Sequence, residues 1–177
     1  MEQTPSDASA KAVAFANGLR KNITVSGRRW TQWPGGGNNL AAVLACIDGI
    51  GARLHSGEVA SCIADLRAIL EWTQYQSASL ATARALITAR KTRAFAERFG
   101  ILDNPAARLS VLVDSEESLI ENVRTKNAYM LAIAERHPHL ALPRPLVRLE
   151  SLAAPVERKP GKLDLIQQLT KSAKKRK

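Results

Sequence analysis

Clustered basic side chains are the residues of this sequence that could do chemistry. Residues 84–98 hold five bases and one acid, and three of the bases recur every seven residues, as Arg84, Lys91 and Arg98. Basic clusters attract polyanions, and arginine binds phosphate oxygens through two parallel N–H groups. Such a row suits the phosphates along a nucleic-acid backbone. A solvated helix face without a ligand would show the same pattern.

A second basic segment joins Arg28 and Arg29 to Trp30, with Trp33 close behind. An indole can stack on an unpaired base while neighbouring arginines bind phosphate. Alternatively, the tryptophans pack in a core that has few other aromatic residues. Both interpretations stay open for Trp30, and we place Trp33 in the core.

The charge of the whole chain follows the same clusters. The net charge is +10 and the pI is near 10.1. Bases outnumber acids by three in residues 1–29, by four in 84–98 and by seven in 158–177, and the rest is mildly acidic. Clustered bases at such a pI are typical of nucleic-acid-binding proteins. The predicted nucleic-acid-binding residues are Arg28, Arg29, Trp30, Arg84, Arg90, Lys91, Arg93, Arg98, Arg108, Lys171, Lys174, Lys175, Arg176 and Lys177.

No residue pattern indicates catalysis or a metal centre. His137 and His139 have Glu135 nearby, but a zinc site needs more ligands at fitting distances, so we expect solvated histidines and no metal or cofactor. Cys46 and Cys62 are too few for a disulfide framework or a four-cysteine site. The run of three glycines lacks the lysine and hydroxyl of a phosphate loop, and no serine has a nucleophile-elbow pattern. We therefore predict that the protein is not an enzyme.

Helices must position most of the basic side chains. Apolar periodicity predicts one helix capped by Asn38 or Asn39 and another that begins near Glu58. The alanine-rich and arginine-rich segment that follows has strong helix propensity and ends at Gly100, a natural C-cap. Residues 74–79 are polar but hold no glycine or proline, so a break there stays open.

Two short segments alternate as strands do, residues 22–26 and 107–113. In the second, Arg108 and Ser110 share one face, and Asp114 begins a capping-box spacing that marks a helix start. A strand followed by a capped helix resembles half of a ribbon–helix–helix unit, in which a two-stranded ribbon enters the DNA major groove. The resemblance would place Arg108 and Ser110 at the DNA, although no glycine turn follows for that family's second helix.

The expected fold is mainly α: a compact helical domain of four to five helices over residues 11–150. The segments 22–26 and 107–113 could pair as a short two-stranded β-ribbon. Residues 1–10 are predicted to be a disordered leader, and residues 151–177 a linker and basic tail. No apolar run approaches the roughly 20 residues that span a bilayer, and the polar N-terminus is not typical of a signal peptide. We therefore expect a cytoplasmic protein without a membrane partner.

These observations favour a non-enzymatic nucleic-acid-binding accessory or regulatory protein, with DNA preferred to RNA, which works as an oligomer. Contacts would come from residues 84–98, from Arg28 and Arg29, and from the basic tail. The alternative is a protein–protein adaptor or assembly subunit that docks through its helices and the amphipathic segment 163–169. A third interpretation is a packaging protein that covers long nucleic acid without regard to sequence.

Overall fold

Helices make up nearly all of the described chain. The computed structural model describes the backbone of residues 7–100 and 105–153 and the side chains of residues 7–100 and 115–152. Its helices, in chain order, are α1 (Asp7–Ser26), the 3-10 helix η1 (Gly27–Gln32), α2 (Gly36–His55), α3 (Val59–Phe99), α4 (Pro105–Arg136), the 3-10 helix η2 (Pro138–Leu140) and α5 (Leu149–Ala153). The predicted class, a helical domain of four to five helices, is confirmed for this part of the chain.

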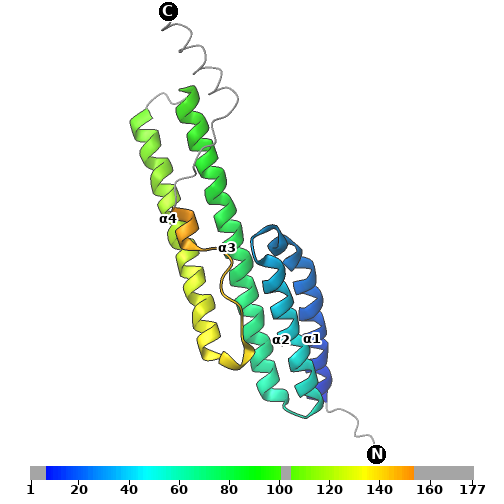
Figure 1. Cartoon of the computed structure of the whole chain (residues 1–177). Helices are drawn as coiled ribbons and strands as arrows, with labels where there is room; N and C mark the ends of the chain where they lie inside the picture. The colour runs from blue at the N-terminus through cyan, green and yellow to red at the C-terminus, as the bar shows by residue number, and fades with distance from the viewer. Residues whose placement is uncertain (1–6, 101–104, 154–177) are drawn as a thin grey trace, which may run out of the picture.

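The central element is α3, whose 41 residues span about 60 Å at 1.5 Å per residue. The pair α1 and α2 packs against the first part of α3, and α4 runs antiparallel along its other side (Figure 1). The hairpin of α3 and α4 continues past the α1–α2 pair as a two-helix arm. None of the helices in the described ranges is long and apolar enough to cross a membrane.

The core includes residues of α1 to α4 and of the 3-10 helices, and its two largest buried side chains lie where η1 meets α3. Trp30 and Trp72 are at most 1% exposed, and their rings meet edge to face with centroids 5.9 Å apart. Gly36 is required beside them, because a Cβ at this position would lie 1.8 Å from the backbone oxygen of Trp30. The glycine-rich loop thus lets the start of α2 pass directly against η1.

A strap, residues 137–148, turns back from the end of α4 and runs along α3 to α5 (Figure 1). Apart from η2 it forms no regular element, so its backbone groups need side-chain partners. Side chains from α2, α3 and α4 supply them at 2.7–3.1 Å, in bonds that join Asn39 to Arg144, Cys46 to Leu140, Gln76 to Leu146 and Asn127 to Val147. The strap therefore ties three helices together.

The two predicted strands are wrong, and the ribbon with them. Residues 22–26 continue α1, and residues 107–113 lie within α4. Ile23 extends the buried row that α1 already presents at helical spacing, so packing overrides its β-branched preference. Short apolar alternation cannot by itself separate strand from helix, and residues 107–113 had no partner strand once 22–26 were helical. The resemblance to a ribbon–helix–helix unit therefore fails.

Several predicted boundaries also change. The cap at Asn38 or Asn39 is wrong, because α2 begins at Gly36 and Gly35 occupies its N-cap. The capping box at Asp114 is wrong as well, since α4 begins at Pro105. The helix predicted to begin near Glu58 is confirmed, and it continues unbroken through residues 74–79 to a C-cap at Gly100.

The domain limits shift by a few residues. Asp7, inside the predicted leader, already begins α1, and α5 crosses the predicted limit at residue 150. The remainder of the leader, residues 1–6, and the basic tail from residue 154 onward lie outside the described residues.

Candidate functional site

The C-terminal part of α3 carries an exposed face on which bases alternate with apolar side chains. We call it the basic–aromatic face, and its members are Arg84, Ile87, Lys91, Phe95, Arg98 and Phe99. Phe95 and Phe99 are 56% and 57% exposed, and their ring centroids lie 4.5 Å apart. The guanidinium of Arg98 lies 5.6 Å from the centroid of the Phe99 ring. Two exposed aromatic rings thus stand among three exposed bases.

Helical geometry separates this face from the acid in the same stretch. Glu97 lies on the side of α3 that carries Arg90 and Arg93, away from the basic–aromatic face. Seven residues of helix rise about 10.5 Å, close to the axial rise of three nucleotides at about 3.4 Å each. The bases of the face therefore have a spacing that phosphates of one strand can match.

The predicted pair Arg28 and Arg29 lies near the start of this face. Both side chains are exposed in η1. In the same short helix, Gln32 accepts a hydrogen bond from the guanidinium of Arg84. This bond places η1 beside α3, so Gln32 and Arg84, which are 52 positions apart in the sequence, are neighbours on the surface.

Trp30 does not belong to the surface, and its prediction as a base-stacking residue is wrong. Its side chain is 1% exposed, and its indole Nε1 donates to Ser77 Oγ at 3.3 Å. The physical reason is that a core with few aromatic residues uses its tryptophans for packing. Trp33, placed in the core from sequence, is half-buried and packs against it.

Arg90 and Arg93 do not lie on an open phosphate-binding face, although the sequence predicted them there. Both pair with Glu116 of α4, with nitrogen–oxygen distances of 3.3 Å and 2.8 Å. The Glu116 side chain is 9% exposed, and the two arginine side chains are 19% and 31% exposed. They therefore act between the helices of the arm, where they neutralise a buried carboxylate.

Six predicted residues cannot be placed in the interface by the structure. The position of Arg108 falls in α4, but its side chain lies outside the described side chains. The five tail bases also lie outside the described residues: Lys171, Lys174, Lys175, Arg176 and Lys177. The segment 163–169, which the adaptor hypothesis uses for docking, also lies outside the described residues.

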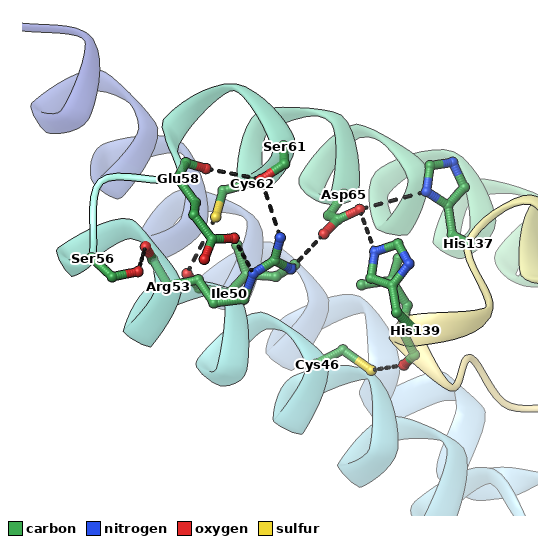
Figure 2. Close-up of polar contacts among 11 residues, drawn as sticks. Cys46, Ile50, Arg53, Ser56, Glu58, Ser61, Cys62, Asp65, His137 and His139 are labelled. Carbon is green, nitrogen blue, oxygen red and sulfur yellow. Dashed lines mark hydrogen bonds and ion pairs between the residues drawn. The ribbon is translucent and has the colours of Figure 1, made fainter.

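A second polar cluster, which the sequence analysis missed, surrounds Asp65 of α3 (Figure 2). The carboxylate is 4% exposed; its Oδ2 accepts from Arg53 Nη1 at 2.7 Å, and its Oδ1 lies 2.8 Å from His139 Nε2. His137 Nδ1 lies 3.5 Å from the same Oδ1. Arg53 also contacts Glu58 at 3.1 Å. Sequence had indicated solvated loop histidines; His139 is indeed half exposed, but both imidazoles also contact a buried carboxylate.

The groups around Asp65 determine the protonation state of its carboxylate. Burial alone would raise the pKa of Asp65, but the hydrogen bonds from Arg53 and His139 outweigh it and hold the pKa below its ordinary value. Asp65 is therefore ionised at neutral pH. The only signal in the sequence was an acidic residue on the apolar side of a predicted helix, and nothing local linked it to histidines 72 and 74 positions away.

A shallow cavity of about 440 Å³ adjoins the cluster and is lined in part by Cys46, Arg53 and His139. Burial raises the pKa of the Cys46 thiol, and burial likewise raises that of Cys62. The Sγ of Cys46 donates to the backbone oxygen of Leu140 at 2.7 Å. Since a nucleophilic cysteine needs a lowered pKa, this environment does not activate either thiol.

Comparisons of the chain with models of protein families, with curated proteins and with solved structures found no match.

Proposed function

We propose that this protein is a non-enzymatic nucleic-acid-binding accessory protein, with DNA as its preferred ligand, and that the basic–aromatic face is its contact surface. The observation that carries the proposal is the exposed pair Phe95 and Phe99 standing among Arg84, Lys91 and Arg98. Surface bases alone are common, but two large exposed aromatic rings within a basic row are the usual composition of a strand-binding surface.

The chemistry of the face favours an unpaired strand. The bases would bind phosphates and release counterions, while the phenylalanine rings would stack on bases of any sequence. Arg28 and Arg29 would extend the contact beyond Arg84. The basic tail would add affinity as a sequence-based prediction, and a cytoplasmic location remains our expectation.

The test is fluorescence anisotropy with labelled single-stranded DNA, duplex DNA and single-stranded RNA at two salt concentrations. A triple charge reversal, R84E/K91E/R98E, should weaken binding of single-stranded DNA and flatten the slope of log K against log salt by about 2, since each lost phosphate contact contributes about 0.7. The pair F95A/F99A should weaken binding by about tenfold per ring, in line with about 1–3 kcal/mol per stacked base.

The matched control is K21E/R67E/R136E, which reverses three exposed bases away from the face. Each triple lowers the net charge by six, from +10 to +4, so both change long-range attraction equally. Equal losses in the two triples would mean that net charge, and not the face, governs binding. Absence of DNA binding by the wild-type protein at low salt and micromolar concentration would refute the proposal.

The adaptor hypothesis keeps one specific observation in its favour. Ile87, Phe95 and Phe99 are all at least 40% exposed and could dock on an apolar partner. A protein partner held by these side chains would lose binding with F95A/F99A and would change little with salt. Steep salt dependence combined with loss in R84E/K91E/R98E favours nucleic acid.

A further inference from the structure

Three potential ligand atoms converge at the base of the strap, apart from the basic–aromatic face (Figure 2). They are Asp65 Oδ1 from α3, His137 Nδ1 at the end of α4 and His139 Nε2 from η2, and all three lie within 4.8 Å of one another. We propose that these residues bind a divalent transition-metal ion of the zinc type. This set of two imidazoles and one carboxylate is a common zinc ligand set that leaves a fourth position for water.

The distances fit such an ion with small adjustments. Ligands bound to tetrahedral zinc at about 2.0–2.1 Å lie about 3.3 Å from one another. Asp65 Oδ1 lies 2.8 Å from His139 Nε2 and 3.5 Å from His137 Nδ1, on either side of that value. All three atoms lie within 4.8 Å of one another, so side-chain rotations would bring them to zinc-binding distances.

The surrounding groups orient the carboxylate for one-atom coordination. Arg53 Nη1 binds Oδ2 of Asp65 at 2.7 Å, which leaves Oδ1 facing both imidazoles. Arg53 is fixed in turn by Glu58 at 3.1 Å and by Ser61 Oγ at 3.1 Å. Outer-shell hydrogen bonds of this kind are typical around metal ligands, because they fix ligand orientation.

The charge of the cluster also favours a cation. Asp65 and Glu58 carry two negative charges against the single positive charge of Arg53, so the cluster has a net charge of −1 before the histidines are counted. Without an ion, the imidazole of His139 donates its Nε2–H to Asp65 Oδ1, and a bound cation would take the place of that proton and attract all three ligand atoms. A bound ion would thus be a common partner for the two imidazoles and the buried carboxylate oxygen.

The backbone holds both histidines in place without the ion. The amide of His137 donates to Ile133 O at 3.0 Å, and that of Leu140 donates to His137 O at 3.0 Å. Cys46 Sγ donates to Leu140 O on the other side of the turn. Part of the ordering that a metal would otherwise impose is therefore already present. The adjoining cavity and the 52% exposure of the His139 side chain leave an entry path.

The experiment uses the full-length, untagged protein after dialysis against EDTA. Zinc chloride is titrated by isothermal calorimetry, and thermal unfolding is followed with and without zinc. We expect one bound zinc per chain and a rise in Tm of about 5–10 °C at a hundredfold excess over Kd. The variant H137A/H139A should lose both effects, and H55A, which removes the third histidine, should keep them. Magnesium should not compete, because it prefers oxygen ligands.

A second measurement needs no variant, in case H137A/H139A does not fold. Imidazole NMR signals of the wild-type protein should show zinc-dependent shifts for two histidines and none for the third. No zinc binding at 100 µM, or binding that survives in folded H137A/H139A, would overturn the proposal. So would zinc-dependent shifts that include the His55 signals, because His55 lies outside the cluster and contacts Gly51 O.

Discussion

Asp65 and Asp48 offer a matched test of how burial changes the value of an ion pair. Each aspartate pairs with one arginine at nearly the same distance, 2.7 Å from Arg53 for Asp65 and 2.8 Å from Arg20 for Asp48. The Asp65 side chain is 4% exposed, whereas the Asp48 side chain is 55% exposed. The substitutions D65N and D48N therefore remove the same charge from the same kind of contact in two different surroundings.

The expected loss for D65N follows from its partners. Breaking a buried ion pair costs about 3–5 kcal/mol. Arg53 is 34% exposed and keeps Glu58, so water and the second carboxylate compensate part of the loss. We expect D65N to lower the free energy of unfolding by about 2–3 kcal/mol, or Tm by about 5–10 °C. Exposed pairs contribute little, so D48N should stay within the error of the measurement.

The assay is urea unfolding in EDTA at several pH values. Because the pKa of Asp65 is lowered in the folded state from its ordinary value of 3.8, its contribution is complete above about pH 4 and is lost as pH falls through the folded pKa. The gap between wild type and D65N should narrow as the pH falls below about 4. Equal losses for D65N and D48N, or a gap that does not narrow in acid, would refute the reasoning.

Two further substitutions test the packing and the strap. G36A should destabilise the protein strongly, because its Cβ would clash with the backbone oxygen of Trp30, while G37A in the same turn has open space and should stabilise slightly; comparative thermal melts of the two variants decide this. Q76L should cost about 1–3 kcal/mol and increase hydrogen exchange at the Leu146 amide, whose partner at 3.1 Å is Gln76 Oε1. Unchanged exchange at Leu146 would show that this bond does not hold the strap.

Local features of the sequence predicted α3 well. The alanine-rich propensity of its C-terminal part and the C-cap at Gly100 depend only on neighbours in the chain, and both agree with the structure. The same reasoning failed for residues 22–26 and 107–113, where alternation suited a strand but a helix was already continuous. Short segments follow the element in which they are embedded more than their own pattern.

The polar cluster could not be predicted because it depends on tertiary structure. Glu135, the acid that lies near the histidines in sequence, is exposed, whereas Asp65 reaches His139 from a different helix. Arg90 and Arg93 show the same limit, since their partner Glu116 becomes visible only when α4 folds back along α3. Spacing showed where bases gather, but not which of them remain exposed.

The strap gives the molecule two levels of local stability. Residues 137–148 are hydrogen-bonded to side chains of α2, α3 and α4, so opening this region breaks several contacts at once. In the arm, α3 packs against α4, and Arg90 pairs with Glu116 between the two helices, so we expect the arm to open at a lower free energy than the body that the strap closes. A ligand on the arm would thus suppress local fraying more than global unfolding. The protein would then combine a stable body with a two-helix arm whose local opening depends on ligand binding.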